Sequence, residues 1–274
     1  MRVLRPRSLE EAVAMRAGED VVPMAGGTDL LVHWPVRLES RDRTYLDLWG
    51  LEELTFLRWT DGWLELGALA TYWDVIRDGR AERELPILAE AARQVGAIQI
   101  QARGTWGGNI ANASPAADGV PVLMACDSTV VLTSVRGERE VPLEGFYHSY
   151  KEMDLAPDEL VTAIRIPRRS RPVQRFIKVG SRRAQAIAKV GLALALSDEG
   201  WRCVAASVAP TVRRCPAIES RLEAEWAPAS ADDLLPAIRS DVTPIDDLRS
   251  TAAYREATMA RLLFHAWPDR GGGA

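Results

Sequence analysis

The chain is organised around Gly104-Thr105-Trp106-Gly107-Gly108-Asn109-Ile110-Ala111-Asn112-Ala113-Ser114-Pro115-Ala116-Ala117-Asp118. This stretch combines adjacent glycines with short hydroxyl and amide side chains, and no Lys or Arg occurs between Arg103 and Arg136. Adjacent glycines can turn the backbone through positive φ and let another group approach the main chain closely. Since successive backbone amides in such a turn form a concavity with fixed dipoles, the stretch can bind a phosphate without a cationic side chain.

A second stretch repeats this composition earlier in the chain. The apolar run Val21-Val22-Pro23-Met24 leads into Ala25-Gly26-Gly27-Thr28-Asp29, where small polar residues open a helix. Two such loops suit a ligand with two phosphates. Alone, each glycine pair is equally consistent with a tight turn from strand to helix. Neither stretch contains G-x-G-x-x-G or G-x-x-x-x-G-K-[ST], so the sequence supports neither a Rossmann dinucleotide site nor a P-loop.

Composition and charge exclude several classes of protein. The 274 residues are 47% hydrophobic and 26% charged, which is enough for two modest cores. A net charge of -4 argues against binding to nucleic acid or to an anionic membrane surface. No apolar run is long enough for membrane insertion and the N-terminus lacks the core of a signal peptide, so we expect a cytoplasmic protein.

Metal ligands are scattered along the sequence. The chain has three cysteines and three histidines, with no C-x-x-C pair. We therefore expect no metal site, and we expect reduced, structural cysteines. These residues are Cys126, Cys203, Cys215, His33, His148 and His265.

Residues 1 to about 54 predict a small β-α-β-α-β unit. Ser8 and Glu11 have the spacing of a capping box, which predicts a helix over 9–17. Thr28 or Asp29 can cap a second, short helix that Pro35 limits. The strands are expected at 21–24 and 43–47.

Residues 55–169 predict a larger α+β region. Asp61-Gly62 is the most direct hairpin signal, and it joins strands at 56–59 and 63–66. Ser114 followed by Pro115 has the form of an N-cap with proline at the first helical position, which places Asp118 within the first two turns of a helix ending near 126. Further helices are expected at 71–78 and 85–95, and further strands at 129–135 and 159–166.

A change of composition at 167–172 (Pro-Arg-Arg-Ser-Arg-Pro) predicts a linker. Beyond it, alternating apolar residues predict three strands, at 174–179, 188–196 and 201–209. Three helices are expected after them, at about 215–224, 230–239 and 246–266, and a disordered tail over 269–274.

Several of these segments resemble one family. Ala25-Gly26-Gly27-Thr28-Asp29, Thr105-Trp106-Gly107-Gly108-Asn109, Ser114-Pro115-x-x-Asp118, Arg175 to Val190 and Tyr254-Arg255 are similar to the FAD-binding medium subunit of the molybdenum hydroxylases, which include xanthine dehydrogenase and carbon monoxide dehydrogenase. The resemblance covers nearly the whole chain.

The fold that this resemblance implies is α+β. It consists of a two-part FAD-binding domain of the PCMH, or vanillyl-alcohol oxidase-like, type over 1–169, with parts of about 1–54 and 55–169. A small C-terminal domain of the CO dehydrogenase flavoprotein type follows over 170–268, with a three-stranded antiparallel sheet and helices.

The resemblance also implies FAD as the cofactor. It assigns the pyrophosphate cradle to the two glycine pairs and places Lys178 near the isoalloxazine, where a cation could stabilise a reduced flavin. Without the resemblance, Lys178 is equally a solvated strand residue, and Asp118 is equally an acid favoured by the helix dipole. The implied cofactor-binding residues are Met24, Ala25, Gly26, Gly27, Thr28, Asp29, Val95, Thr105, Trp106, Gly107, Gly108, Asn109, Asn112, Asp118, Leu155 and Lys178.

The implied function is electron transfer within a complex. A large molybdopterin-binding subunit and a small subunit with two-iron two-sulfur clusters are the expected partners, in a dimer of heterotrimers, and no catalytic residue is expected on this chain. Two alternatives stay open, a self-contained FAD oxidase or reductase and a non-catalytic nucleotide-binding assembly module. Arg182, Arg183 and Lys189 form either a partner surface or a solvated edge.

Overall fold

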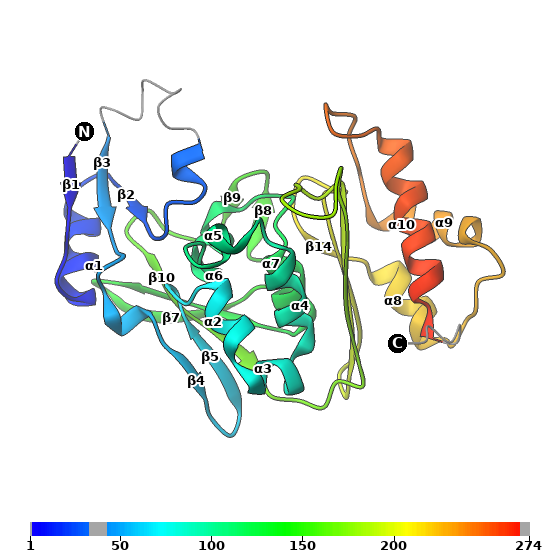
Figure 1. Cartoon of the computed structure of the whole chain (residues 1–274), viewed down its shortest axis with the longest axis horizontal. Coiled ribbons are helices and arrows are strands. Elements are labelled where there is room, and N and C mark those ends of the chain that lie inside the picture. The colour runs from blue at the N-terminus through cyan, green and yellow to red at the C-terminus, as the bar shows by residue number, and fades with distance from the viewer. Residues whose placement is uncertain (1, 33–42, 269–274) are drawn as a thin grey trace.

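Three short strands open the chain in the computed structural model, which describes residues 2–32 and 43–268 (Figure 1). β1 (Arg2–Leu4) and β2 (Val21–Met24) both pair in parallel with β3 (Thr44–Asp47), and α1 (Leu9–Gly18) connects β1 to β2. A single 3₁₀ turn, η1 (Leu30–Val32), follows the first glycine pair. The β-α-β part of the prediction is confirmed, whereas the predicted limit at Pro35 lies outside the described residues.

The predicted capping box of α1 forms only in part. The Ser8 hydroxyl accepts a hydrogen bond from the amide of Glu11 at 3.1 Å, as expected. The Glu11 carboxylate, however, accepts from the amide of Arg7 at 2.6 Å and not from that of Ser8. One cap bond is enough to begin the helix at the predicted residue, since it satisfies one of the orphan amides of the first turn.

A five-stranded antiparallel sheet forms the centre of the molecule. Its strand order is β4-β5-β10-β6-β7, so that β10 pairs with both β5 and β6. The β4–β5 hairpin turns at Asp61-Gly62, as the sequence predicts. The strands are β4 (Leu57–Trp59), β5 (Trp63–Gly67), β6 (Thr129–Ser134), β7 (Gly137–Pro142) and β10 (Leu160–Pro167).

The helices that the chain forms between β5 and β6 lie beside this sheet (Figure 1). α4 and α7 lie between the two sheets, so Phe176, Ala193 and Val204 of the C-terminal sheet belong to the same buried cluster as Leu64 and Ile164 of the central one. The two halves therefore share this buried cluster, although each also has a cluster of its own. The helices are α2 (Tyr72–Arg77), α3 (Gly79–Glu84), α4 (Pro86–Gln94), α5 (Ile98–Gln101), α6 (Trp106–Asn112) and α7 (Gly119–Ala125), with η3 (Glu52–Leu54) and the small hairpin β8 (Tyr147–Ser149) and β9 (Glu152–Met153) between other elements.

The predicted start of α7 is wrong. Ser114 to Ala117 form a turn, in which the amide of Ala117 donates to the carbonyl of Ser114 at 3.1 Å. The carbonyl of Pro115 accepts from the amide of Ser207 at 2.7 Å, beyond the end of β13 (Gly200–Ala206), and so is engaged by a distant segment instead of by the next helical turn. The helix begins only at Gly119, with Asp118 at its N-cap position.

The C-terminal sheet is antiparallel and has four strands where three were expected. β11 (Val173–Val179), β12 (Val190–Ser197) and β13 are the predicted strands, and the two-residue β14 (Arg213–Arg214) was too short to give a pattern. The sheet face opposite α4 and α7 is covered by helices (Figure 1). These are α8 (Pro216–Glu223), η4 (Ala231–Leu234), α9 (Leu235–Asp241) and α10 (Ala252–Ala266).

α10 begins six residues later than predicted, because Asp247 closes a turn ahead of it. Its carboxylate accepts from the amides of Arg249 and Ser250 at 2.8 and 3.0 Å, and Thr251 then caps the helix. Within the described residues, no helix has the length and apolar character needed to cross a membrane. The predicted disordered tail lies outside the described residues.

We expect Trp106→Ala to lower the free energy of unfolding by about 3–5 kcal/mol, the usual cost of removing a large aromatic side chain from a core. The side chain is fully buried, and its ring lies 5.0 Å from that of Tyr72. Trp63→Ala is the matched control, since Trp63 is 38% exposed and should change stability by roughly 0.5 kcal/mol. Urea denaturation of the two variants measures both values, and equal losses would contradict the described core.

Candidate cofactor site

The two glycine loops meet in space. A Cβ on Gly26 would lie 1.6 Å from the carbonyl oxygen of Arg103, the residue just before the second loop. At the other end of that loop, the Asn112 side-chain amide donates to the Asp29 carboxylate at 3.0 Å. Only glycine permits the first contact, so the fold brings the two sequence motifs together as one site.

The glycines serve different purposes. Gly27 has a φ of +73°, so the expectation of a positive-φ turn is right for this residue. Gly107 lies in the first turn of α6, where a Cβ would lie 2.7 Å from the carbonyl oxygen of Ala68. The second pair therefore does not turn through positive φ, and Gly107 instead allows α6 to pack on Ala68.

A side chain on Gly108 would have a single close neighbour. A Cβ on Gly108 would meet only the Thr105 hydroxyl, at 2.8 Å. That hydroxyl accepts a hydrogen bond from the backbone amide of Gly108 at 3.0 Å and so caps α6. Asn109 caps the next helix, since its side-chain oxygen accepts from the amide of Gly119 at 3.2 Å. Two of the predicted polar contacts are thus already engaged in holding α6 and α7.

Trp106 faces the core and not the site. Its side chain is fully buried, and its amide donates to the carbonyl of Ala70 at 3.0 Å. The backbone amide is therefore engaged, whereas the indole N–H is buried without a hydrogen-bond partner among the described residues, and contact of Trp106 with a cofactor stays a prediction. Its role is to support the loop from beneath.

A buried ion pair lies at the edge of the C-terminal sheet. The Lys178 ammonium of β11 lies 2.6 Å from a carboxylate oxygen of Asp118 and donates to the carbonyl of Gln94 at 2.9 Å. The Lys178 and Asp118 side chains are only 6% and 12% exposed. Lys178 is therefore not a solvated strand residue. It is in direct contact with Asp118, a second predicted site residue that lies far from it in the sequence.

The second carboxylate oxygen of Asp118 is buried and has no hydrogen-bond partner in the part of the chain that the structure describes. Burial raises the pKa of Asp118 to about 6, although the charge and the hydrogen bond of Lys178 act in the opposite direction. The nearby Tyr72 is buried too, and burial followed by the charge of Asp118 raises its pKa. An unpartnered buried oxygen beside a buried cation is a site able to receive a polar ligand group.

The remaining predicted residues lie around these groups. Val95 directly follows Gln94 at the end of α4, and it is half-buried against the shared core together with Leu155. In the first loop, Thr28 is half-buried and Asp29 is exposed. Met24 and Ala25 are half-buried at the end of β2.

Lys151 lies at the site although no sequence motif indicated it. Its ammonium donates to the backbone carbonyl and, at 2.7 Å, to the side-chain oxygen of Asn112. The chain has only three lysines among its 34 basic residues, at 151, 178 and 189. Two of them lie at this site, and that scarcity is the only signal in the sequence that could have pointed to Lys151.

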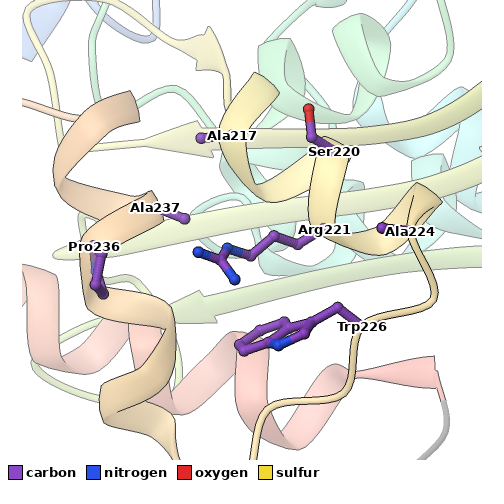
Figure 2. Close-up of a pocket in the computed structure, with 7 residues that line it drawn as sticks. All are labelled: Ala217, Ser220, Arg221, Ala224, Trp226, Pro236 and Ala237. Atoms are coloured by element: carbon purple, nitrogen blue, oxygen red, sulfur yellow. The ribbon is translucent and has the colours of Figure 1, made fainter.

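A separate groove of about 530 Å³ lies between α8 and α9, with Arg221 and Trp226 facing it (Figure 2). Its lining shares no residue with the two loops. Among the described residues, no group of His, Cys, Asp and Glu could hold a metal ion, and the three cysteines are buried and unpaired.

Comparison with known families agrees with this geometry. Residues 1–169 match the FAD binding domain in molybdopterin dehydrogenase, and residues 175–269 match the CO dehydrogenase flavoprotein C-terminal domain. The chain belongs to the FAD-binding molybdopterin dehydrogenase family. The first matched range contains both glycine loops, and the second contains Lys178.

Members of this family resemble the chain over most of its length. The nicotinate dehydrogenase FAD-subunit of Eubacterium barkeri is 35% identical over 74% of this chain and 71% of its own. The glyceraldehyde dehydrogenase medium chain of Sulfolobus acidocaldarius is 29% identical over 97% of this chain and 96% of its own. In a solved structure, the carbon monoxide dehydrogenase of Hydrogenophaga pseudoflava lacking the Mo-pyranopterin moiety superposes with a TM-score of 0.86, 27% identity and coverage of 96% of this chain and 94% of that one.

The residues present fit the family's cofactor. The absence of a side chain at Gly108, where a Cβ would meet only the Thr105 hydroxyl, suits a phosphate oxygen that must approach the main chain. The unpartnered oxygen of Asp118 and the buried ammonium of Lys178 offer an acceptor and a cation to a heteroaromatic ring with polar edges.

We expect the Asp118 carboxyl to make the ligand-free protein less stable as pH rises from about 4 to about 6. The folded protein holds this proton more tightly than the unfolded chain, in which the pKa has its ordinary value of 3.8. The free energy of unfolding should therefore fall by about 2–3 kcal/mol across that window, and Asp118→Asn should remove this part of the slope.

Denaturation of the unsubstituted protein and of Asp118→Asn at a series of pH values gives the difference between the pH dependences of their free energies of unfolding. A carboxyl ¹³C resonance for Asp118 that titrates near pH 4, at its ordinary value, would contradict the burial described here.

Proposed function

We propose that this chain is the FAD-carrying electron-transfer subunit of a cytoplasmic molybdopterin-dependent hydroxylase or dehydrogenase. Its partners would be a large molybdopterin-binding subunit and a small iron–sulfur subunit, in a dimer of heterotrimers. The observation that carries the proposal is the meeting of the two glycine loops beside the buried Lys178–Asp118 pair. Membership of the family, and relatives named as FAD-subunit and medium chain, support it.

Two groups of residues would hold the cofactor. The loops around Gly26–Gly27 and Gly107–Gly108 would accept the pyrophosphate, through close approach to the backbone and through amide donors. Lys178 would lie beside the isoalloxazine, where its charge favours a more negative ring. Val95 and Leu155 would supply apolar contact.

The cofactor supplies the redox chemistry in this proposal, by accepting electrons and passing them to an external acceptor. The chain's own residues bind it, orient it and set the charge beside it. No general base or nucleophile is assigned. A self-contained oxidase would need a substrate pocket next to the flavin, and the groove between α8 and α9 shares no residue with the proposed flavin site.

We expect Gly108→Val to weaken FAD binding by about 2–3 kcal/mol, or roughly 30- to 150-fold in dissociation constant. A branched side chain at Gly108 would block the approach of a phosphate group and press on the capping hydroxyl of Thr105. Gly18→Val is the matched control, because Gly18 is also helical and a Cβ there would meet nothing within 4 Å. Titration of each variant with FAD, followed by flavin fluorescence, measures the two dissociation constants. Equal values for Gly108→Val and Gly18→Val would show that the cradle lies elsewhere.

We expect the native complex to contain one larger and one smaller partner, and acid precipitation to release FAD into the supernatant.

The isolated subunit should hold flavin that dithionite reduces, but it should not oxidise aldehydes, purines, N-heterocycles or carbon monoxide. Affinity purification from the native source, with flavin and metal analysis, makes the test. Turnover by the isolated subunit without molybdenum or iron would establish the self-contained alternative, and absence of FAD from the native complex would refute the proposal.

A further inference from the structure

The β8–β9 hairpin holds the C-terminal end of α6. The Tyr147 hydroxyl donates to the carbonyl of Ile110 at 3.0 Å, and the Lys151 ammonium donates to the carbonyl of Asn112. Both acceptors lie in the last turn of α6, where a cation is favoured by the helix dipole, and the Ile110 carbonyl also accepts from the amide of Ala113 at 3.0 Å. The hairpin therefore anchors the helix whose first turn contains Gly107 and Gly108.

Lys151 also determines how the Asn112 side chain is oriented. Its ammonium is a donor only, so the amide oxygen of Asn112 must face it, at 2.7 Å. The amide nitrogen then points the other way and donates to Asp29 at 3.0 Å. These three residues form a continuous contact, here called the Lys151–Asn112–Asp29 bridge, from the β8–β9 hairpin through α6 to the first glycine loop.

The backbone of Lys151 is itself constrained. Its φ of +63° lies in the left-handed region that residues other than glycine adopt infrequently. Such a conformation persists where surrounding contacts hold it, and here the two bonds to Asn112 lie at the end of the side chain. The turn is thus arranged to direct this lysine at α6.

The other two lysines of the chain are committed elsewhere. Lys178 pairs with Asp118, and Lys189 lies over the ring of Tyr254, 5.3 Å from its centroid. The bridge therefore provides a positive charge at the end of the second loop, a stretch whose own sequence has none between Arg103 and Arg136. Its two ends, Lys151 and Asp29, are exposed, so its strength should depend on ionic strength.

We propose that Lys151 is a positioning residue for the cofactor, which acts through Asn112 to keep the two glycine loops together and so slows the release of FAD. This inference rests on the proposed function. Lys151 has no role in the chemistry of the flavin and need not touch it. Its effect is on the residence time of the ligand, because the loops must separate for a group held between them to leave.

Release of FAD from the flavin-loaded subunit tests the proposal. We expect Lys151→Met to release FAD about three- to tenfold faster at low salt, the range for losing a charge-assisted surface contact. Lys151→Arg should restore slow release, because it keeps the charge and the donors. Capture of the released FAD by an excess of an apoflavoenzyme, followed through the activity that the captured flavin restores, measures the rates, and added salt should reduce the difference between Lys151→Met and the unsubstituted protein.

Lys189→Met is the matched control, since it removes a lysine that does not contact the loops. Its release rate should equal that of the unsubstituted protein, and the two Lys151 variants should melt at nearly the same temperature as that protein because Lys151 is exposed. Unchanged release from Lys151→Met would overturn the positioning role while leaving the proposed function intact. Failure of the unsubstituted protein to bind FAD would overturn both.

A double-variant cycle separates positioning from direct contact. If Lys151 acts through Asn112 on Asp29, then Lys151→Met and Asp29→Ala disable the same bridge, and the double variant should release FAD no faster than the faster single one. Effects that multiply would show that Lys151 touches the ligand independently, and would overturn the proposed bridge.

Discussion

The ion pair between Lys178 and Asp118 connects the two halves of the molecule at the site. Lys178 belongs to the C-terminal sheet, whereas Asp118 begins α7, which packs on both sheets. Burying two charges costs several kcal/mol per ion, which the attraction between them offsets only with good geometry and further hydrogen bonds. Here one carboxylate oxygen lacks a partner among the described residues, so the pair is better suited to receiving a ligand than to stabilising the fold.

Close backbone approach is the second constraint on the site. Gly26 lies against the carbonyl of Arg103, and Gly107 lies against that of Ala68, at positions where any Cβ would overlap an oxygen atom. The first contact places the first loop against the segment that precedes α6, and the second packs α6 on the residue that follows β5. At Gly108, where a Cβ would meet only the Thr105 hydroxyl, the missing side chain lets a phosphate group approach the backbone.

The polar side chains of the loops mostly hold the scaffold. Thr105 caps α6, Asn109 binds the first amide of α7, and Asn112 joins α6 to the first loop. A motif that identifies a cofactor family thus contains residues whose immediate contacts are structural. Ligand binding and loop architecture depend on the same residues, because a site made from backbone groups requires the backbone to be fixed in place.

The sequence by itself determined the elements that depend on interactions between neighbouring residues. The Ser8 cap of α1, the hairpin at Asp61-Gly62 and the alternation of β11 to β13 act over a few residues, and each was found where the pattern indicated. The resemblance of the two glycine stretches to a known family indicated the α+β fold and the cofactor. Tertiary structure alone decided the start of α7, where the bond from Ser207 to Pro115 overrides a good local cap, and the burial of Trp106. It also decided that Lys178 meets Asp118 and that Lys151 meets Asn112, because these partners are 60 and 39 residues apart and only packing of the intervening elements brings them within hydrogen-bonding distance.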